Sequence, residues 1–128
     1  MIYGVGIDII DINRIRNVID KYGVKFKNRC FTMNEINRSE KKYNVIESYA
    51  KRYAAKEACA KALGTGLARG VFWKDIEVKN DKYGKPFIIL HKNAKKYLQF
   101  VNLQNNIKIE LSLTDEKHFA LANVVIFS

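Results

Sequence analysis

Two acidic residues occupy positions where apolar residues are expected. Asp8 lies between two isoleucines in a run that is typical of a β-strand. Glu57 continues the apolar stripe that Ile46, Ala50 and Tyr53 form along a predicted helix. A carboxylate withdrawn from water costs several kcal/mol unless a cation or a set of donors compensates it. Carboxylates that converge from separate elements form a hard oxygen site suited to Mg²⁺, so Asp8 and Glu57 are candidates for a shared metal site.

Lys61 adds a cation to this group. It lies at the helical i+4 position from Glu57, and the pair could also be an ordinary exposed ion pair worth about 0.3–0.5 kcal/mol. Asp8 could likewise lie on the solvated face of an edge strand. The helix ends at Gly64-Thr65-Gly66, where glycine can adopt the left-handed conformation that terminates a helix. Because the dipole at this end of a helix does not favour phosphate, the local pattern indicates a C-cap rather than a phosphate loop.

Composition bounds the class of protein. The chain has 128 residues, which is room for one domain with one modest core. Hydrophobic residues make up 48% and there is a single proline, so a folded chain is expected rather than a disordered one. The formal net charge of +10 indicates an acidic partner. That partner could be nucleic acid, an anionic membrane surface, a polyphosphate ligand or an acidic protein.

The cysteines and the N-terminus bear on the compartment. Cys30 and Cys59 are the only cysteines, and neither has a partner at zinc-site spacing, which favours a reduced, cytosolic chain. The apolar N-terminal run contains Asp8 and Asp11, which argues against a signal peptide. No stretch approaches the roughly 18–20 uncharged apolar residues of a membrane span.

The elements that must position these residues begin with a strand over residues 1–12. Its side chains alternate, with Val5, Ile7 and Ile9 on one face and Gly4, Gly6, Asp8 and Ile10 on the other. Asp11 can cap a helix that Gly23 ends, and Arg14 lies off the apolar stripe of that helix. Residues 24–30 are basic and could form a short helical turn.

The rest of the chain continues this mixture of helices and strands. Thr32 and Glu35 form a capping box for a short helix to about residue 42, and the long helix spans residues 43–63. Strands are predicted over residues 75–79, 87–90, 107–113 and 119–127, with a short helix over 94–101 and a turn at 114–117. The fold class is therefore α+β, a mainly antiparallel sheet packed against one long central helix and shorter helices.

Several motifs match one known family. They are Gly4-x-Gly6-Ile7-Asp8-Ile9 followed by Arg14 and Ile15, Phe31-Thr32-x-x-Glu35, the run Arg52 to Gly66, Asp75-Ile76-Glu77, Gly84-Lys85-Pro86 and Phe119-Ala120. On these residues the chain resembles the holo-acyl-carrier-protein synthases, the short 4′-phosphopantetheinyl transferases. The match runs nearly end to end, and residues 54–66 are its most specific part.

The resemblance implies a single 4′-phosphopantetheinyl transferase domain over residues 1–128. It implies a cytoplasmic, Mg²⁺-dependent enzyme of fatty acid biosynthesis that moves phosphopantetheine from coenzyme A to a serine of acyl carrier protein. Adenosine 3′,5′-bisphosphate would be released. It also implies a homotrimer with active sites between neighbouring subunits. The net charge of +10 fits both acidic partners.

Carried over residue by residue, the resemblance implies a role for each candidate. Asp8 and Glu57 would be the metal ligands, and Lys61 would contact the coenzyme A pyrophosphate. Glu57 or a metal-bound water would take the proton from the serine hydroxyl. Residues that would hold coenzyme A are Arg52, Lys61, Gly64, Thr65, Gly66, Lys85, Pro86 and Thr114. Arg14 would face the acidic carrier protein.

One position departs from the family pattern. The family usually has a histidine after a serine in the turn before the last strand, where this chain has Thr114-Asp115. His118 lies three positions further on and does not align. Because an anion close to phosphates is repelled by them, we expect Asp115 to weaken coenzyme A binding without altering the chemical step. If Asp115 instead points away from the ligand, for example by capping its own turn, its replacement by histidine should have no effect.

Two other classes of function fit parts of the sequence. A small basic nucleic-acid-binding module would use exposed tyrosines for stacking, but Tyr49, Tyr53 and Tyr97 lie on apolar helix stripes and no RNA-binding motif is recognisable. We therefore expect no nucleic acid partner. A scaffold that binds carrier protein without catalysis is the third possibility, if Asp115 abolishes coenzyme A binding. Titration of coenzyme A with and without Mg²⁺ separates the three.

Overall fold

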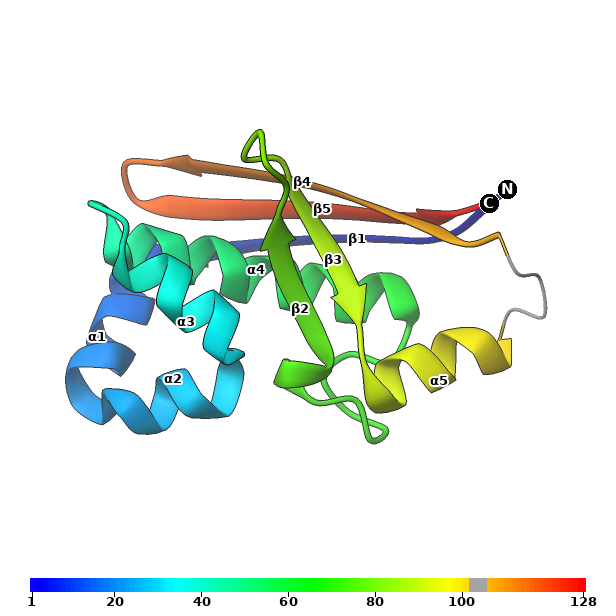
Figure 1. The fold of residues 1–128 in the computed structure, drawn as a ribbon, viewed down its shortest axis with the longest axis horizontal. Coiled ribbons are helices and arrows are strands. Elements are labelled where there is room, and N and C mark those ends of the chain that lie inside the picture. Colours follow the sequence, from blue (N-terminus) through cyan, green and yellow to red (C-terminus); the bar gives the residue numbers. More distant parts are fainter. Residues whose placement is uncertain (102–105) are drawn as a thin grey trace.

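The structure is a computed structural model that describes residues 1–101 and 106–128. The chain order is β1 (Ile2–Asp11), α1 (Ile12–Tyr22), α2 (Val24–Cys30), α3 (Met33–Glu40), α4 (Val45–Leu63), the 3₁₀ turn η1 (Trp73–Asp75), β2 (Ile76–Asn80), β3 (Pro86–Leu90), α5 (Lys92–Val101), β4 (Lys108–Glu116) and β5 (Phe119–Phe127). Figure 1 shows α4 running along the sheet of β1, β5 and β4, with α1, α2 and α3 gathered at one end. The predicted α+β class is confirmed. Among the described helices, none is long and apolar enough to cross a membrane.

The sheet that carries Asp8 has three antiparallel strands in the order β1-β5-β4. β5 is its central strand, and Asp8, Ala122 and Leu113 lie in register across it. The hairpin of β2 and β3 forms a separate two-stranded sheet. The chain ends lie side by side (Figure 1), and the N-terminal ammonium donates to the Ser128 carbonyl at 2.9 Å.

Glycines allow β1 to approach α4 closely. A Cβ atom on Gly4 would lie 1.9 Å from the carbonyl oxygen of Ala62, and one on Gly6 would lie 1.8 Å from that of Ala58. These separations are far below any van der Waals contact, so both positions require glycine for steric reasons. The close approach brings Asp8, on the same face of β1, next to the C-terminal half of α4.

The outward face of β1 is the apolar one. Val5, Ile7 and Ile9 are 59%, 57% and 60% exposed, whereas Ile10 on the inner face is buried. The predicted alternation is therefore correct, but the glycine-rich face is the one that packs on the core. An exposed apolar face of this kind marks an interaction surface.

Two predicted boundaries in the later strands are wrong. β4 continues to Glu116 because residues 114–116 pair with residues 119–121 of β5, so the turn consists of Lys117 and His118 alone. Asp75 belongs to η1, and β2 begins at Ile76. Ile76, Glu77 and Val78 are all buried because β2 contacts both α3 and α4, so this strand does not alternate in burial.

Helix ends follow the predicted capping residues. The Asp11 carboxylate accepts from the Asn13 backbone N–H at 2.8 Å. The capping box at Thr32 and Glu35 is present, with both reciprocal bonds formed. Gly64 ends α4 in the left-handed conformation, at φ 86°. Residues 24–30, which were ambiguous in sequence, form the short helix α2.

Candidate active site

Asp8 and Lys61 form the centre of the candidate site. The Lys61 Nζ donates to Asp8 Oδ1 at 3.2 Å and to the Ile7 carbonyl at 3.0 Å. The side chain of Asp8 is 16% exposed and that of Lys61 is 53% exposed. Lys61 therefore pairs across to β1 instead of forming the i+4 bridge to Glu57, and Asp8 does not lie on a solvated strand face.

Glu57 interacts electrostatically with both Asp8 and Lys61. Burial raises the pKa of Glu57 above its ordinary value, the negative charge of Asp8 raises it further, and Lys61 and Arg14 oppose the rise. Arg14 is exposed on α1, as its position off the apolar stripe predicted. The site thus draws charged side chains from β1, α1 and α4, and burial together with the charge of Asp8 outweighs Lys61 and Arg14 in setting the pKa of Glu57.

This donor set fits a magnesium ion. The oxygens of Asp8 and Glu57 are hard ligands of the type that Mg²⁺ takes. In residues 1–101 and 106–128 there is no group of three or more His, Cys, Asp or Glu that could hold a metal. A cation at Asp8 and Glu57 would therefore take two protein ligands and complete its shell with water or substrate oxygens, as Mg²⁺ commonly does.

A basic pocket of about 290 Å³ lies near the N-terminal half of α4. Its lining residues are Arg38, Lys42, Ser48, Lys51, Arg52, Asn80, Gly84, Pro86 and Leu113. The pocket thus brings the predicted residues Arg52 and Pro86 together, and it contains four cations and no acid. Sequence reasoning missed Arg38, Lys42, Lys51 and Asn80 as pocket residues. The three basic residues among them differ in sequence from no other surface cation, and Asn80 reads as an ordinary turn residue, so no local signal marked the four as pocket residues.

Other predicted nucleotide-binding residues do not line this pocket. The Lys85 Nζ lies 3.4 Å from Glu110 Oε2 and its side chain is 62% exposed. Thr114 is exposed and pairs with Leu121, which is in register with Ile9 on the outer face of the sheet. The glycine loop begins three residues after Lys61, at Gly64, and the Thr65 hydroxyl donates to the Gly66 carbonyl at 2.6 Å.

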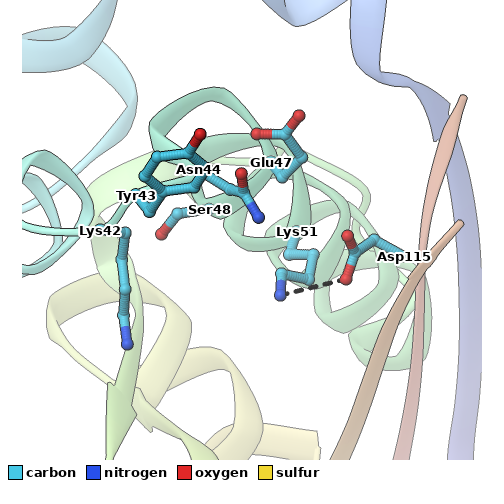
Figure 2. A pocket seen from close by; sticks show the side chains of 7 residues that line it. All are labelled: Lys42, Tyr43, Asn44, Glu47, Ser48, Lys51 and Asp115. Carbon is cyan, nitrogen blue, oxygen red and sulfur yellow. Dashed lines mark ion pairs between the residues drawn. The ribbon is translucent and has the colours of Figure 1, made fainter. Parts of the chain in front are cut away.

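Asp115 lies in a neighbouring pocket. Figure 2 shows its carboxylate turned toward Lys51, and the Lys51 Nζ is 3.2 Å from Asp115 Oδ1. This second pocket is lined by Lys42, Tyr43, Asn44, Glu47, Ser48, Lys51 and Asp115. Because Lys51 also lines the basic pocket, the charge of Asp115 acts on a cation of that pocket.

Behind the site, a buried ion pair fixes α4. Lys56 and Glu35 are both fully buried, with Lys56 Nζ 2.7 Å from Glu35 Oε1. The ammonium also donates to the carbonyls of Trp73 and Ile76, and Glu35 Oε2 accepts from the Val78 N–H at 3.0 Å. Sequence reasoning missed this pair. The signal was the run of small and apolar residues at 54–55 and 58–60 around Lys56, which indicates a helix with little solvated face there.

An apolar hollow adjoins Asp8 and Lys61 at the outer face of the sheet. It is lined by Ile7, Asp8, Ile9, Lys61 and Leu121. The charged site therefore opens at the edge of the exposed apolar face of β1, rather than at the centre of an enclosed cavity.

Comparison with known proteins gives the class of this chain. Residues 4–122 match the 4′-phosphopantetheinyl transferase superfamily. The holo-acyl-carrier-protein synthase of Rhizobium meliloti (strain 1021) is 51% identical over 127 residues, which cover 98% of this chain and 91% of the relative. The chain therefore belongs to the 4′-phosphopantetheinyl transferase superfamily. Within it, the chain belongs to the holo-acyl-carrier-protein synthases, and it is an enzyme, a phosphopantetheinyl transferase.

Solved structures of that family share the fold. The crystal structure of the Neisseria meningitidis synthase has a TM-score of 0.87 at 34% identity, and the match covers 100% of both chains. The synthase from Bacillus anthracis str. Ames, solved in complex with CoA (3′,5′-ADP), has a TM-score of 0.79 at 41% identity and covers 98% of this chain and 96% of its own.

Proposed function

We propose that this enzyme transfers the 4′-phosphopantetheine group of coenzyme A to a serine of apo-acyl carrier protein, with Mg²⁺, in fatty acid biosynthesis. The other product is adenosine 3′,5′-bisphosphate. The observation that carries the proposal is the grouping of Asp8 on β1 with Glu57 and Lys61 on α4, the helix whose Arg52 lines the basic pocket. The relative from Bacillus anthracis was solved with coenzyme A, which supports the same donor here.

Asp8 and Glu57 would hold the magnesium ion. When bound, Mg²⁺ supplies positive charge to the pyrophosphate and to the leaving group. Lys61 adds a second cation that can move from Asp8 to a phosphate oxygen, because its side chain is half exposed. Glu57 is the proposed proton acceptor, since burial and the charge of Asp8 raise its pKa and make it more basic than an ordinary glutamate in the metal-free protein.

The transfer is a phosphoryl transfer, in which positioning and charge stabilisation do most of the work. The serine oxygen forms a bond to the phosphorus that bears the pantetheine. The bond from that phosphorus to the oxygen of adenosine 3′,5′-bisphosphate breaks, and the leaving group departs with its electron pair. The serine proton goes to Glu57. The protein contributes by fixing Asp8 and Lys61 through the close packing of β1 on α4.

The basic pocket would hold the nucleotide end of coenzyme A. Arg52, Gly84 and Pro86 line it, and we propose that Lys85, between the last two in sequence, reaches the same ligand. Gly64, Thr65 and Gly66 follow Lys61 and would place backbone groups beside the pyrophosphate. Arg14, exposed on α1 and close enough to act on Glu57, would meet the acidic carrier protein.

We also propose a homotrimer with its active sites between subunits. The exposed apolar face of β1 supports this assembly, because burying it in water-free contact is favourable at about 25 cal/mol per Å². Thr114 lies on that face and away from the basic pocket of its own chain, so it could serve a neighbouring site. The cytoplasm is the proposed compartment, which the two free, buried cysteines fit.

The direct test measures transfer with purified apo-acyl carrier protein and coenzyme A. Mass spectrometry should find the carrier heavier by one phosphopantetheine only when Mg²⁺ is present. Calorimetry with Mg²⁺ and coenzyme A should show that Asp8→Ala and Glu57→Ala each abolish metal-dependent binding. Glu47→Ala, a change of another glutamate on α4, is the control. Full metal-dependent binding in either site variant would end the claim of a shared ion.

A further inference from the structure

Arg52 is a buried cation with few partners. Its residue is 4% exposed, and its Nε has no hydrogen-bond partner among the described residues. Burial lowers the pKa of its guanidinium. The Nη2 atom donates to Asn80 Oδ1 at 2.8 Å. A guanidinium this buried normally has a carboxylate or several acceptors around it, so the arrangement leaves donors for an anion in the basic pocket.

Asn80 bonds in two directions. Its Oδ1 accepts from Arg52, and its Nδ2 donates to the Gly84 carbonyl at 3.0 Å. Asn80 is the last residue of β2, and Gly84 lies in the turn that precedes Pro86. One amide side chain therefore joins α4 to the β2–β3 turn. Arg52, Asn80, Gly84 and Pro86 all line the same pocket.

We propose that Asn80 is a positioning residue for coenzyme A binding, which orients the Arg52 guanidinium and ties it to the β2–β3 turn. A neutral amide suits this role because it holds Arg52 without neutralising it, whereas a carboxylate would occupy the charge that the nucleotide phosphates need. The inference rests on the proposed function, in which this pocket holds the nucleotide end of coenzyme A. Asn80 itself need not touch the ligand.

The proposal is tested with adenosine 3′,5′-bisphosphate and no metal, by calorimetry on the full chain. Asn80→Ala should weaken binding by about 10-fold, the size expected when one hydrogen bond to a charged group is lost. Asn80→Asp keeps the acceptor for Arg52 but cancels its charge, so it should weaken binding more than Asn80→Ala. It should also flatten the dependence of affinity on salt. In the transfer assay, Asn80→Ala should raise KM for coenzyme A and leave kcat within about 2-fold.

A double-mutant cycle separates positioning from a structural role. In an Arg52→Lys background, whose ammonium lacks the fork that Asn80 orients, Asn80→Ala should change affinity by less than about 2-fold. Asn93→Ala is the matched control, because Asn93 Nδ2 also donates to a glycine carbonyl, that of Gly70 at 2.9 Å, without contacting Arg52. Circular dichroism melting establishes that each variant is folded.

The outcomes distinguish this inference from the proposed function. Equal losses for Asn80→Ala in the parent and in the Arg52→Lys background would overturn the positioning role, as would equal behaviour of the Asn80→Asp and Asn80→Ala variants. A parent enzyme that binds adenosine 3′,5′-bisphosphate, with Asn80→Ala unchanged, would overturn the inference alone. A parent enzyme that neither binds this nucleotide nor transfers phosphopantetheine would overturn the proposed function as well.

Discussion

Gly6 lies so close to Ala58 that a Cβ atom at Gly6 would stand 1.8 Å from the Ala58 carbonyl oxygen. This contact between β1 and α4 sets the distance between the strand that carries Asp8 and the helix that carries Glu57 and Lys61. The atoms in contact belong to the backbone, so no side chain can rotate away to relieve the clash that a larger residue at Gly6 would cause. The position of the metal ligands therefore depends on a residue that takes no part in chemistry.

Gly6→Ala should destabilise the enzyme by at least about 2–3 kcal/mol, because α4 and β1 must separate. Urea unfolding followed by circular dichroism gives the change. Gly23→Ala is the control, since a Cβ there meets only the Ile19 carbonyl at 3.8 Å and the cost is limited to its positive φ of 52°. A Gly6→Ala variant as stable as the parent would contradict the close packing.

Glu57→Gln should stabilise the metal-free enzyme at neutral pH. The folded-state pKa of Glu57 lies above 4.5 because of burial and then Asp8. The stability linked to its protonation is complete below about pH 4.5 and is lost as pH rises through the folded-state pKa. With a chelator present to remove metal ions, the Tm of the variant should therefore exceed that of the parent by about 1–4 °C at pH 7.5. The difference in Tm should vanish near pH 4. Glu47→Gln should show no such dependence of Tm on pH. A Tm for Glu57→Gln below that of the parent at pH 7.5 would refute the claim that the ionised Glu57 destabilises the metal-free fold.

Lys56→Met should cost about 3–5 kcal/mol, since it leaves the Glu35 carboxylate buried without its cation. Glu35→Gln in the same chain should recover part of the loss because the remaining buried group is then neutral. Denaturant unfolding of the four proteins in this cycle gives the coupling energy. Strictly additive losses would mean that the pair does not act as a unit.

Asp115→Asn should lower KM for coenzyme A by a few fold and leave kcat nearly unchanged. The change removes an anion and frees Lys51 toward the basic pocket, which alters binding uniformly. Asp115→His should behave in the same direction. Glu116→Gln is the control, because it removes an exposed acid of the same strand, β4, that lines neither pocket. A large fall in kcat for either Asp115 variant would assign Asp115 a part in the reaction itself.

Ile7→Glu should break the proposed trimer, because it places a charge on the exposed apolar face of β1. Light scattering should then report monomers, and transfer activity should fall with assembly. Phe100→Glu, at a residue that is 82% exposed on α5, is the control for an added charge at an exposed apolar residue elsewhere. A parent chain that stays monomeric and turns over at full rate would refute the trimer.

Local patterns predicted much of this fold. The capping box at Thr32, the cap at Asp11 and the break at Gly64 each depend on residues close in sequence, so they were readable from the chain. Asp8 was noticed for the same reason, since an acid between isoleucines violates a local rule. The strand end at residues 114–116 was misplaced because polar residues there suggested a turn, whereas pairing with β5 kept them extended.

The contacts between distant elements could not be predicted in this way. The partner of Lys56 could not be found from the local pattern, because Glu35 lies 21 residues away on another helix. The bond from Arg52 to Asn80 spans 28 residues. Such pairs depend on how α3, β2 and α4 pack, and a single sequence carries no measure of that packing.

The position of β5 at the centre of its sheet has a consequence for the order of folding during synthesis. β1 and β4 do not pair with each other, and both take their hydrogen bonds from β5, which emerges from the ribosome after them. β1 must therefore wait for a strand more than a hundred residues later before its ladder forms, a delay that loop-closure entropy makes slow. Until then its apolar residues and unpaired edge are exposed, which is the state in which a strand can pair wrongly with other chains.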